Sequence, residues 1–200
     1  MKIIRTLSLT LVAGLAAITL SAETSPATPA SPIAAPRARI SPHETISNII
    51  GERRTGNRVT ITYGRPYTKD PKTGAPRKIW GGLVAWDKAD RLGADEATLL
   101  ITQQSLVVGE TIIPAGAYTL YIVPSEAGVT KLAFSSKLGK WGVPVDESKD
   151  IARVELAKAT LASSVDQLTI GIENDSATGG GVIKIQWETT QFSLPFTVKK

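Results

Sequence analysis

The sequence predicts an all-β domain: an antiparallel β-sandwich of the jelly-roll or immunoglobulin-like type, with roughly eight strands and at most one or two short helices. Three observations support this prediction. Apolar residues recur with period two from Arg58 to the end of the chain, turn residues separate the apolar runs, and segments with helical periodicity are sparse. Each run is apolar on one face and polar on the other, which is typical of antiparallel sheets with one solvated face.

The expected strands follow one another along the chain. Turn signals separate them at 108–110, 125–128 and 174–181, and we interpret the three successive glycines in the last of these as a hairpin turn. The apolar residues that define the strands are, in chain order, Val59, Ile61 and Tyr63; Leu99 and Ile101; Ile112 and Ile113; Tyr118, Leu120 and Ile122; Val129 to Phe134; Ile151 to Leu156; Leu168, Ile170 and Ile172; Ile183, Ile185 and Trp187; and Phe192, Leu194, Phe196 and Val198.

Two short segments are candidates for helix. Residues 42–50 could form a short helix capped by Ser41, with Glu44 at its third position, or equally a strand that enters the domain. Residues 146–150 could add one helical turn.

The first 22 residues have the pattern of a secretory signal peptide. Lys2 and Arg5 supply a positive start, residues 7–20 are uncharged and apolar, and small residues follow at Ser21 and Ala22. The alternative is a transmembrane segment, but about 14 apolar residues is shorter than the roughly 20 that a spanning helix needs. We therefore expect cleavage after Ala22.

The remaining chain divides into two parts. Residues 23–39 are rich in proline, alanine and serine, which predicts a flexible leader. Residues 40–200 are expected to form a single domain, because no internal repeat or second change of composition interrupts them. The mature protein is expected to be exported, either periplasmic or secreted, with no stable membrane span.

Composition excludes several classes of function. The chain has no cysteine, so it has no thiol nucleophile, disulfide or thiolate metal site. Its only histidine is His43, which rules out a cage of several histidines, and we expect no metal and no cofactor. The net charge of +5 includes Lys2 and Arg5, and the remaining basic residues are scattered. A nucleic-acid partner is therefore not expected.

Several short motifs occur in a characteristic order. They are Ser41-Pro42-His43, Tyr63-Gly64-Arg65-Pro66, Trp80-Gly81-Gly82-Leu83-Val84, Arg91 to Thr98, Pro114 to Leu120, and Trp141-Gly142. Together they resemble the signatures of the DUF2911 family of exported bacterial proteins, over roughly Ile40 to the C-terminus. The resemblance implies an all-β exported domain. It implies no reaction, because the function of the family is unknown.

The chain departs from the family pattern at two places. The central signature of the family usually reads Gly-Ala-Asn, and Asp95 stands here in the place of the asparagine. A tryptophan often precedes the arginine of that signature, where this chain has Asp90. Both departures add negative charge, which could change what this loop binds.

The region from Lys78 to Thr98 is the most site-like part of the sequence, because loops on a rigid sandwich often carry binding residues. Trp80 and Trp86 could offer apolar platforms to a sugar or another flat ligand. The alternative is that both tryptophans belong to the core or cover it, and that Arg91 is a buried partner of a carboxylate.

Asp95 and Glu96 could bind a cation or orient an arginine. They could not act as a facing pair of glycosidase carboxylates if they lie in a strand, because adjacent strand residues point to opposite faces. The spacing of acids between Asp87 and Asp95 matches no known calcium loop. Arg65 could face a pocket, or pair with an acid across the sheet.

His43 could form a hydrolytic triad with Ser41 or Ser47 and a carboxylate. The sequence has no Gly-x-Ser-x-Gly elbow, and a histidine at the entry of an element is more often a hydrogen-bonding residue. A structure distinguishes the two roles, since a catalytic His43 needs Arg91, Asp95 or Glu96 within hydrogen-bond reach in an open cleft.

Two functions therefore remain. The first is a non-enzymatic binding module of the cell envelope for a saccharide, a peptide or a protein, with candidate ligand-binding residues His43, Arg65, Trp80, Trp86, Arg91, Asp95 and Glu96. The alternative is a hydrolase that uses His43 and the acids between Asp87 and Glu96. The sequence favours the first, because no nucleophile is evident.

Overall fold

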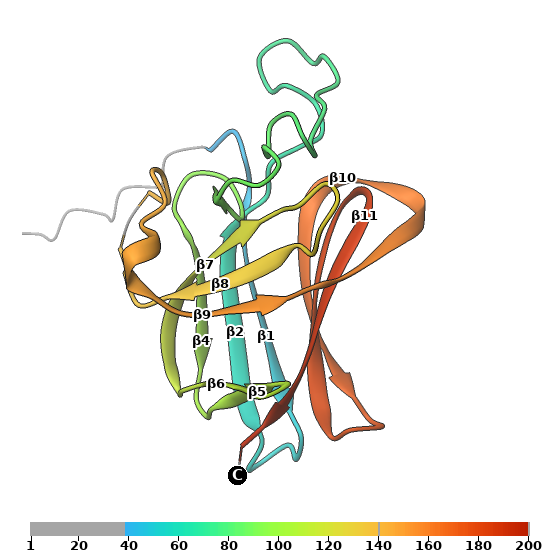
Figure 1. Ribbon diagram of the computed structural model, residues 1–200. Coiled ribbons are helices and arrows are strands. Elements are labelled where there is room, and N and C mark those ends of the chain that lie inside the picture. Colours follow the sequence, from blue (N-terminus) through green and yellow to red (C-terminus); the bar gives the residue numbers. More distant parts are fainter. Residues whose placement is uncertain (1–38, 140, 200) are drawn as a thin grey trace, which may run out of the picture. The chain divides into compact units, whose positions relative to one another are not determined.

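The structure is a computed structural model that describes residues 39–139 and 141–199 (Figure 1). The predicted signal peptide and nearly all of the predicted leader lie outside the described residues. Within them, two antiparallel sheets pack as a β-sandwich, which confirms the predicted fold class.

The larger sheet has seven strands in the order β1-β2-β4-β7-β8-β9, with β3 paired to β7. Its strands are β1 His43–Ile50, β2 Asn57–Gly64, β3 Asp90–Arg91, β4 Thr98–Thr102, β7 Gly116–Val123, β8 Lys131–Ser135 and β9 Asp150–Glu155.

The smaller sheet has four strands in the order β10-β11-β5-β6. Its strands are β5 Leu106–Val108, β6 Thr111–Ile113, β10 Ala157–Asp175 and β11 Gly180–Val198. In Figure 1, β10 and β11 form the long hairpin that runs beside β1. The described residues hold eleven strands, more than the sequence predicts, because very short strands such as β3 have too few residues to show a period.

Both sheets contribute to one apolar core. Period-two side chains of the larger sheet meet those of the smaller sheet, and the largest buried members are aromatic or branched aliphatic residues. The fully buried ones include Ile61, Leu100, Leu120, Phe134, Leu106, Ile183 and Phe192. Burial of these side chains drives the pairing of the sheets.

The two helix candidates have different outcomes. Residues 43–50 form strand β1 and pair along their whole length with β2, so the strand alternative is correct. Within residues 146–150, where one helical turn was predicted, Glu147–Lys149 form a 3₁₀ turn. Its N-cap, Asp146, accepts a hydrogen bond from the Ser148 amide. The described residues contain no helix long and apolar enough to cross a membrane.

Strand β4 has the opposite phase from the one that the sequence indicates. Leu100 is fully buried, whereas Ile101 is 44% exposed and Leu99 lies on the same side as Ile101. The run Leu99-Leu100-Ile101 is apolar at three successive positions, so its period does not decide which face is buried. Leu99 is therefore available to line the solvated face of the sheet.

Strand β11 joins two runs that the sequence predicts as separate strands. The buried residues change from odd positions, such as Trp187, to even positions, such as Phe192. One strand can keep both sets on one face only if the alternation is broken once. The break lies at Glu188, which has a positive φ of 53° and faces a register shift in β10.

The larger sheet presents a solvated outer face, directed away from the core. One row of side chains crosses this face, because residues paired in register on neighbouring strands share a side of the sheet. In strand order the row contains Thr45, Thr62, Leu99, Thr119 and Ser135. This mostly polar row forms the floor of the candidate site.

Tyr63 links the two sheets through its buried hydroxyl. The hydroxyl donates to Glu44 Oε2 on β1 at 2.7 Å and accepts from the Ile170 amide on β10 at 2.8 Å. Burial is the main reason that the pKa of this phenol is raised, so the hydroxyl remains a donor.

We predict that Tyr63→Phe lowers the free energy of unfolding by about 1–3 kcal/mol, because the Ile170 amide then has no buried acceptor. Chemical denaturation measures the loss. Tyr67→Phe is the matched control, since Tyr67 is 37% exposed. Equal losses in the two variants would contradict a specific role for the Tyr63 hydroxyl.

Candidate functional site

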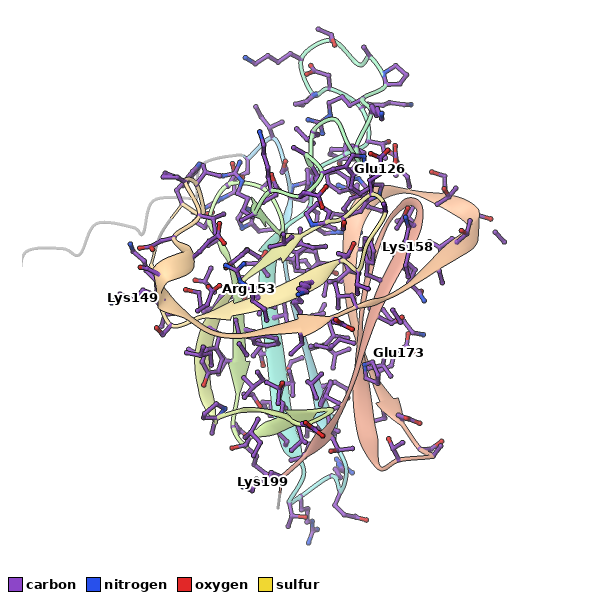
Figure 2. The ribbon with its side chains drawn as sticks, viewed as in Figure 1. Glu126, Lys149, Arg153, Lys158, Glu173 and Lys199 are labelled. Carbon is purple, nitrogen blue, oxygen red and sulfur yellow. The ribbon has the colours of Figure 1, made fainter. Side chains whose placement is uncertain are left out.

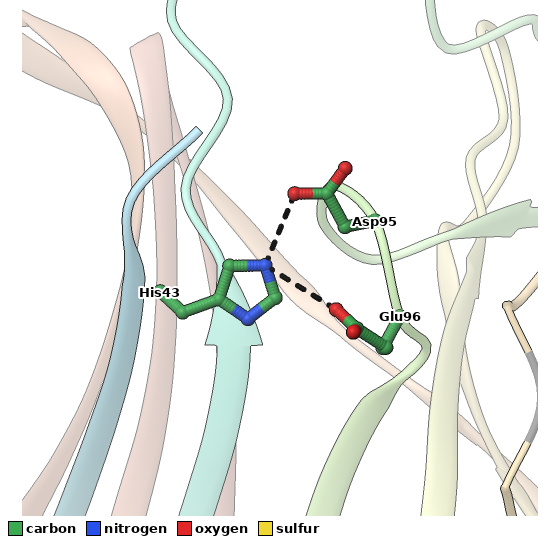
Figure 3. A group of neighbouring side chains, drawn as sticks. All are labelled: His43, Asp95 and Glu96. Carbon is green, nitrogen blue, oxygen red and sulfur yellow. Dashed lines mark hydrogen bonds and ion pairs between the residues drawn. The ribbon is translucent and has the colours of Figure 1, made fainter. Parts of the chain in front are cut away.

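The only histidine of the chain lies beside two carboxylates (Figure 3). His43 is the first residue of β1, and Asp95 and Glu96 lie in the loop between β3 and β4. His43 Nε2 lies 3.2 Å from Asp95 Oδ2 and 3.5 Å from Glu96 Oε2. The three residues, together with Arg39, are called the His43 cluster below.

The loop reaches His43 because it packs directly on the end of β2. A Cβ added at Gly64 would lie 2.2 Å from the Ala94 carbonyl oxygen, so only glycine allows this contact. Asp95 has a φ of 61°, a left-handed conformation that Asp and Asn tolerate better than most residues. Asp95 and Glu96 are not in a strand, so both carboxylates can approach one imidazole.

Arg39 supplies the cation of the cluster. Its Nη2 donates to Glu96 Oε1 at 2.7 Å, and its Nη1 donates to Glu96 Oε2, lies 3.0 Å from His43 Nε2 and lies 3.8 Å from Asp95 Oδ2. The hydrogen bonds from Arg39 lower the pKa of Glu96 to about 2. The carboxylate therefore stays ionised well below neutral pH.

His43, Asp95 and Glu96 could together hold a metal ion, since one donor atom from each lies within 4.8 Å of the others. The Arg39 guanidinium nitrogen contacts the same three donors. A metal ion at this position would have to displace Arg39, because two cations cannot share the donors.

Two cavities adjoin the cluster on the outer face. The smaller, of about 480 Å³, is lined by Arg39, His43 and Glu96 of the cluster, together with Thr62 and Leu99. The larger, of about 690 Å³, lies over β7 and β8. Ala97, Thr119 and Trp141 line both cavities, so we treat them as one groove.

The connection between β8 and β9 forms the wall of the groove. Lys137 pairs with Asp146 across this connection, and the Thr119 hydroxyl donates to the Lys137 carbonyl at 2.7 Å. Trp141 is 54% exposed and lines both cavities. Trp141 is therefore a large apolar side chain that a bound molecule could contact.

Arg91 joins the wall to the His43 cluster. Its Nη1 donates to the Asp95 carbonyl at 2.8 Å and to the Trp141 carbonyl at 3.2 Å. Gly142 has a φ of 90°, and a Cβ there would lie 3.1 Å from Arg91 Cβ. The stem of Arg91 thus packs on the backbone of the wall, and its hydrogen bonds go to carbonyls, not to a carboxylate.

Trp80 and Trp86 lie elsewhere. Their rings stack with centroids 6.5 Å apart, and Trp80 also meets Trp187 and Phe192 edge to face. Lys158, labelled in Figure 2, lies over the Trp86 ring. Neither Trp80 nor Trp86 lines the groove. These contacts fit the alternative in which both tryptophans pack on the core.

Arg65 also points away from the groove. Its Nε lies 3.4 Å from Glu44 Oε2 on β1, and its Nη2 donates to Thr169 Oγ1 at 2.9 Å. Arg65 therefore pairs with an acid on the neighbouring strand, which is the second of the two roles that we considered for it from the sequence. It also ties the end of β2 to β10.

Of the sequence-predicted site residues, the structure brings together His43, Arg91, Asp95 and Glu96. Arg39 and Trp141 were not among the predicted site residues. Arg39 falls at the end of the predicted leader, where no period marks it as part of a site. Trp141 follows no strand pattern, and its Trp-Gly motif was its only signal.

A family model described as "Protein of unknown function (DUF2911)" matches residues 41–196. The chain belongs to the DUF2911 family. No curated protein and no solved structure matches the chain. The family motifs that the sequence shares include Gly64, Arg91, Thr98 and Gly142, and in this DUF2911 member they all belong to the contacts that shape the groove.

Asp90 is a half-buried acid next to Arg91. Burial raises its pKa to about 6, while the charge of Arg91 acts in the opposite direction. The pKa in the folded state is above that of the unfolded state, so the folded state binds the proton more tightly. The resulting stabilisation is complete below about pH 4 and is lost as the pH rises through about 6.

We predict that Asp90→Asn raises the free energy of unfolding at pH 8 by roughly 1 kcal/mol, because partial exposure reduces the full effect of the shift. The gain should disappear near about pH 3, below the ordinary pKa of aspartate, because the Asp90 carboxyl is then mostly protonated in both the folded and the unfolded state. Denaturant unfolding at the two pH values measures it. A difference that does not change with pH would contradict the prediction.

A second prediction concerns the pairing of Arg39 with Glu96. In Arg39→Ala, the pKa of Glu96 should rise from about 2 toward its ordinary value, because the donors that stabilise the carboxylate are gone. A carbon-13 titration of the side-chain carboxyls measures the change, with Glu96→Gln to assign the signal. In the native protein, the stabilising effect of this pair is present above about pH 4.5 and is lost as the pH falls toward 2. An unchanged titration in Arg39→Ala would contradict the pairing.

Proposed function

We propose that this DUF2911 domain is a non-enzymatic binding module that takes a small molecule, or an exposed part of a saccharide or peptide, in the groove. The observation that carries the proposal is the position of Trp141, an exposed tryptophan that lines both adjoining cavities together with Thr119 of the floor. The predicted signal peptide supports a place for the module outside the cytoplasm, in the cell envelope or beyond it.

The dimensions of the groove fit this role. Small-molecule sites in proteins commonly enclose about 300–1,000 Å³ and combine apolar walls with a few polar groups. The larger cavity has a volume of about 690 Å³ and presents Trp141, Val143 and Pro144 beside Thr119 and Arg91. An indole beside hydroxyl groups suits ligands with both apolar and hydrogen-bonding faces.

The hydrolase alternative has one observation in its favour, since His43 does lie within reach of Asp95 and Glu96 at the edge of a cavity. Its nucleophile is the weak point. Among the described residues, no serine hydroxyl bonds to His43, and Ser47 Oγ pairs instead with Thr60 Oγ1 at 3.0 Å. Arg39 also contacts Nε2, the nitrogen that faces the acids. Binding is therefore the better-supported function.

We predict that one class among glycans, peptidoglycan fragments, peptides and small organic molecules raises the midpoint of thermal unfolding saturably. In Trp141→Ala, the ligand concentration that gives half of the maximal shift should rise at least about tenfold, because the indole supplies much of the apolar contact. Ile112→Ala is the control, since Ile112 is 48% exposed and lines neither cavity of the groove. Equal effects of the two substitutions, or no shift with any compound, would contradict binding in the groove.

A further inference from the structure

The charges that line the groove are paired, with one exception. Each carboxylate of the wall and of the His43 cluster has a basic partner close enough for an ion pair. The pairs are Glu96 with Arg39, Asp95 with His43 and Arg39, Asp146 with Lys137, and Glu147 with Arg153, which is labelled in Figure 2. Arg91 forms no ion pair with any carboxylate in the described part of the chain.

Arg91 is fixed in place without using its whole guanidinium. One guanidinium nitrogen, Nη1, donates to the carbonyl oxygens of both Asp95 and Trp141. Within residues 39–139 and 141–199, no acceptor lies in hydrogen-bond geometry with Nε or Nη2. The stem is packed against Gly142, so the side chain loses little further entropy when a ligand binds.

The surroundings of Arg91 in the groove are mostly apolar. Ala97 lies beside it on the floor, and the wall adds the side chains of Trp141, Val143, Pro144 and Val145. A guanidinium in apolar surroundings interacts more strongly with an anion than one in water does. Its planar fork matches the two oxygens of a carboxylate.

We infer that the ligand of the groove is an organic acid, with a carboxylate that pairs with Arg91 and a compact apolar or aromatic body that packs against Trp141. The inference rests on the proposed binding function and adds the chemical class of the ligand. A single unpaired guanidinium balances the single charge of a carboxylate. Ion pairs reduce the repulsion from the neighbouring acids, since Lys137 pairs with Asp146, and Arg153 is shared between Glu147 and Asp150.

The test uses pairs of acids and amides of the same shape. Benzoate, phenylacetate and hexanoate are compared with their uncharged amides by nitrogen-15 NMR titration of the purified protein. The acids should bind saturably and shift the Trp141 indole signal, assigned with Trp141→Ala, and each amide should bind at least about tenfold more weakly. Affinity for the acids should fall as salt is added.

Variants of Arg91 locate the charge. Arg91→Gln should weaken binding of the acids about tenfold or more and leave the amides unchanged. Arg91→Lys keeps a positive charge but lacks the planar guanidinium, so it should retain a smaller preference for acids over amides. It replaces Arg91→Gln in the test if that variant does not fold. Arg53→Gln, in the exposed turn between β1 and β2, changes the net charge equally and should have no effect.

The outcomes separate this inference from the proposed function. Amides that bind as tightly as acids, or acids whose affinity is the same in the native protein and both Arg91 variants, would overturn the class of ligand. Binding of uncharged saccharides or peptides at Trp141, with no preference for acids, would overturn the class and leave the binding function standing. Failure of every compound to perturb Trp141 would overturn both.

Discussion

The contact between Gly64 and the backbone of Ala94 determines where the chemistry of this domain can lie. A side chain at position 64 would collide with the Ala94 carbonyl, so the loop between β3 and β4 lies close to the end of β2 only because this residue is glycine. That approach brings Asp95 and Glu96 to His43, and it places the Asp95 carbonyl where Arg91 donates to it. A small change in one backbone contact would therefore separate the whole group.

The distribution of charge follows from this packing. Once Asp95 and Glu96 are held together beside His43, their mutual repulsion requires a cation, and Arg39 supplies it from the end of the leader. In the wall of the groove, Lys137 pairs with Asp146, and Glu147 pairs with Arg153 of β9. Arg91 is satisfied by carbonyls instead, which hold it in position but do not neutralise its charge. The groove thus combines an acidic end, where one arginine partly compensates two carboxylates, with a fixed positive centre.

The period-two alternation of apolar and polar residues, together with the turn residues between the runs, was sufficient to predict the fold class and most strands. A sheet with one face on the core and one face in solvent requires such alternation. They failed where local pattern is ambiguous: three successive apolar residues hid the phase of β4, and the break at Glu188 in β11 looked like the end of a strand. For the site, sequence selected His43, Arg91, Asp95 and Glu96 by their chemistry. It could not separate half-buried Trp80 from exposed Trp141, because exposure of an aromatic residue depends on partners distant in the chain.

Two residues of this region, Asp90 and Asp95, depart from the sequence pattern that the resemblance to the family suggests. The left-handed backbone at residue 95 suits asparagine and aspartate equally, so Asp95 keeps the loop in place while adding a carboxylate to the His43 cluster. Its contact with Arg91 uses the main-chain carbonyl, which an asparagine would also provide. Asp90 likewise adds charge next to Arg91, and burial raises its pKa enough to keep it partly protonated near pH 6. The contacts that hold Arg91 therefore do not depend on the side chain of residue 95, whereas the carboxylate of that residue adds to the charge of the His43 cluster.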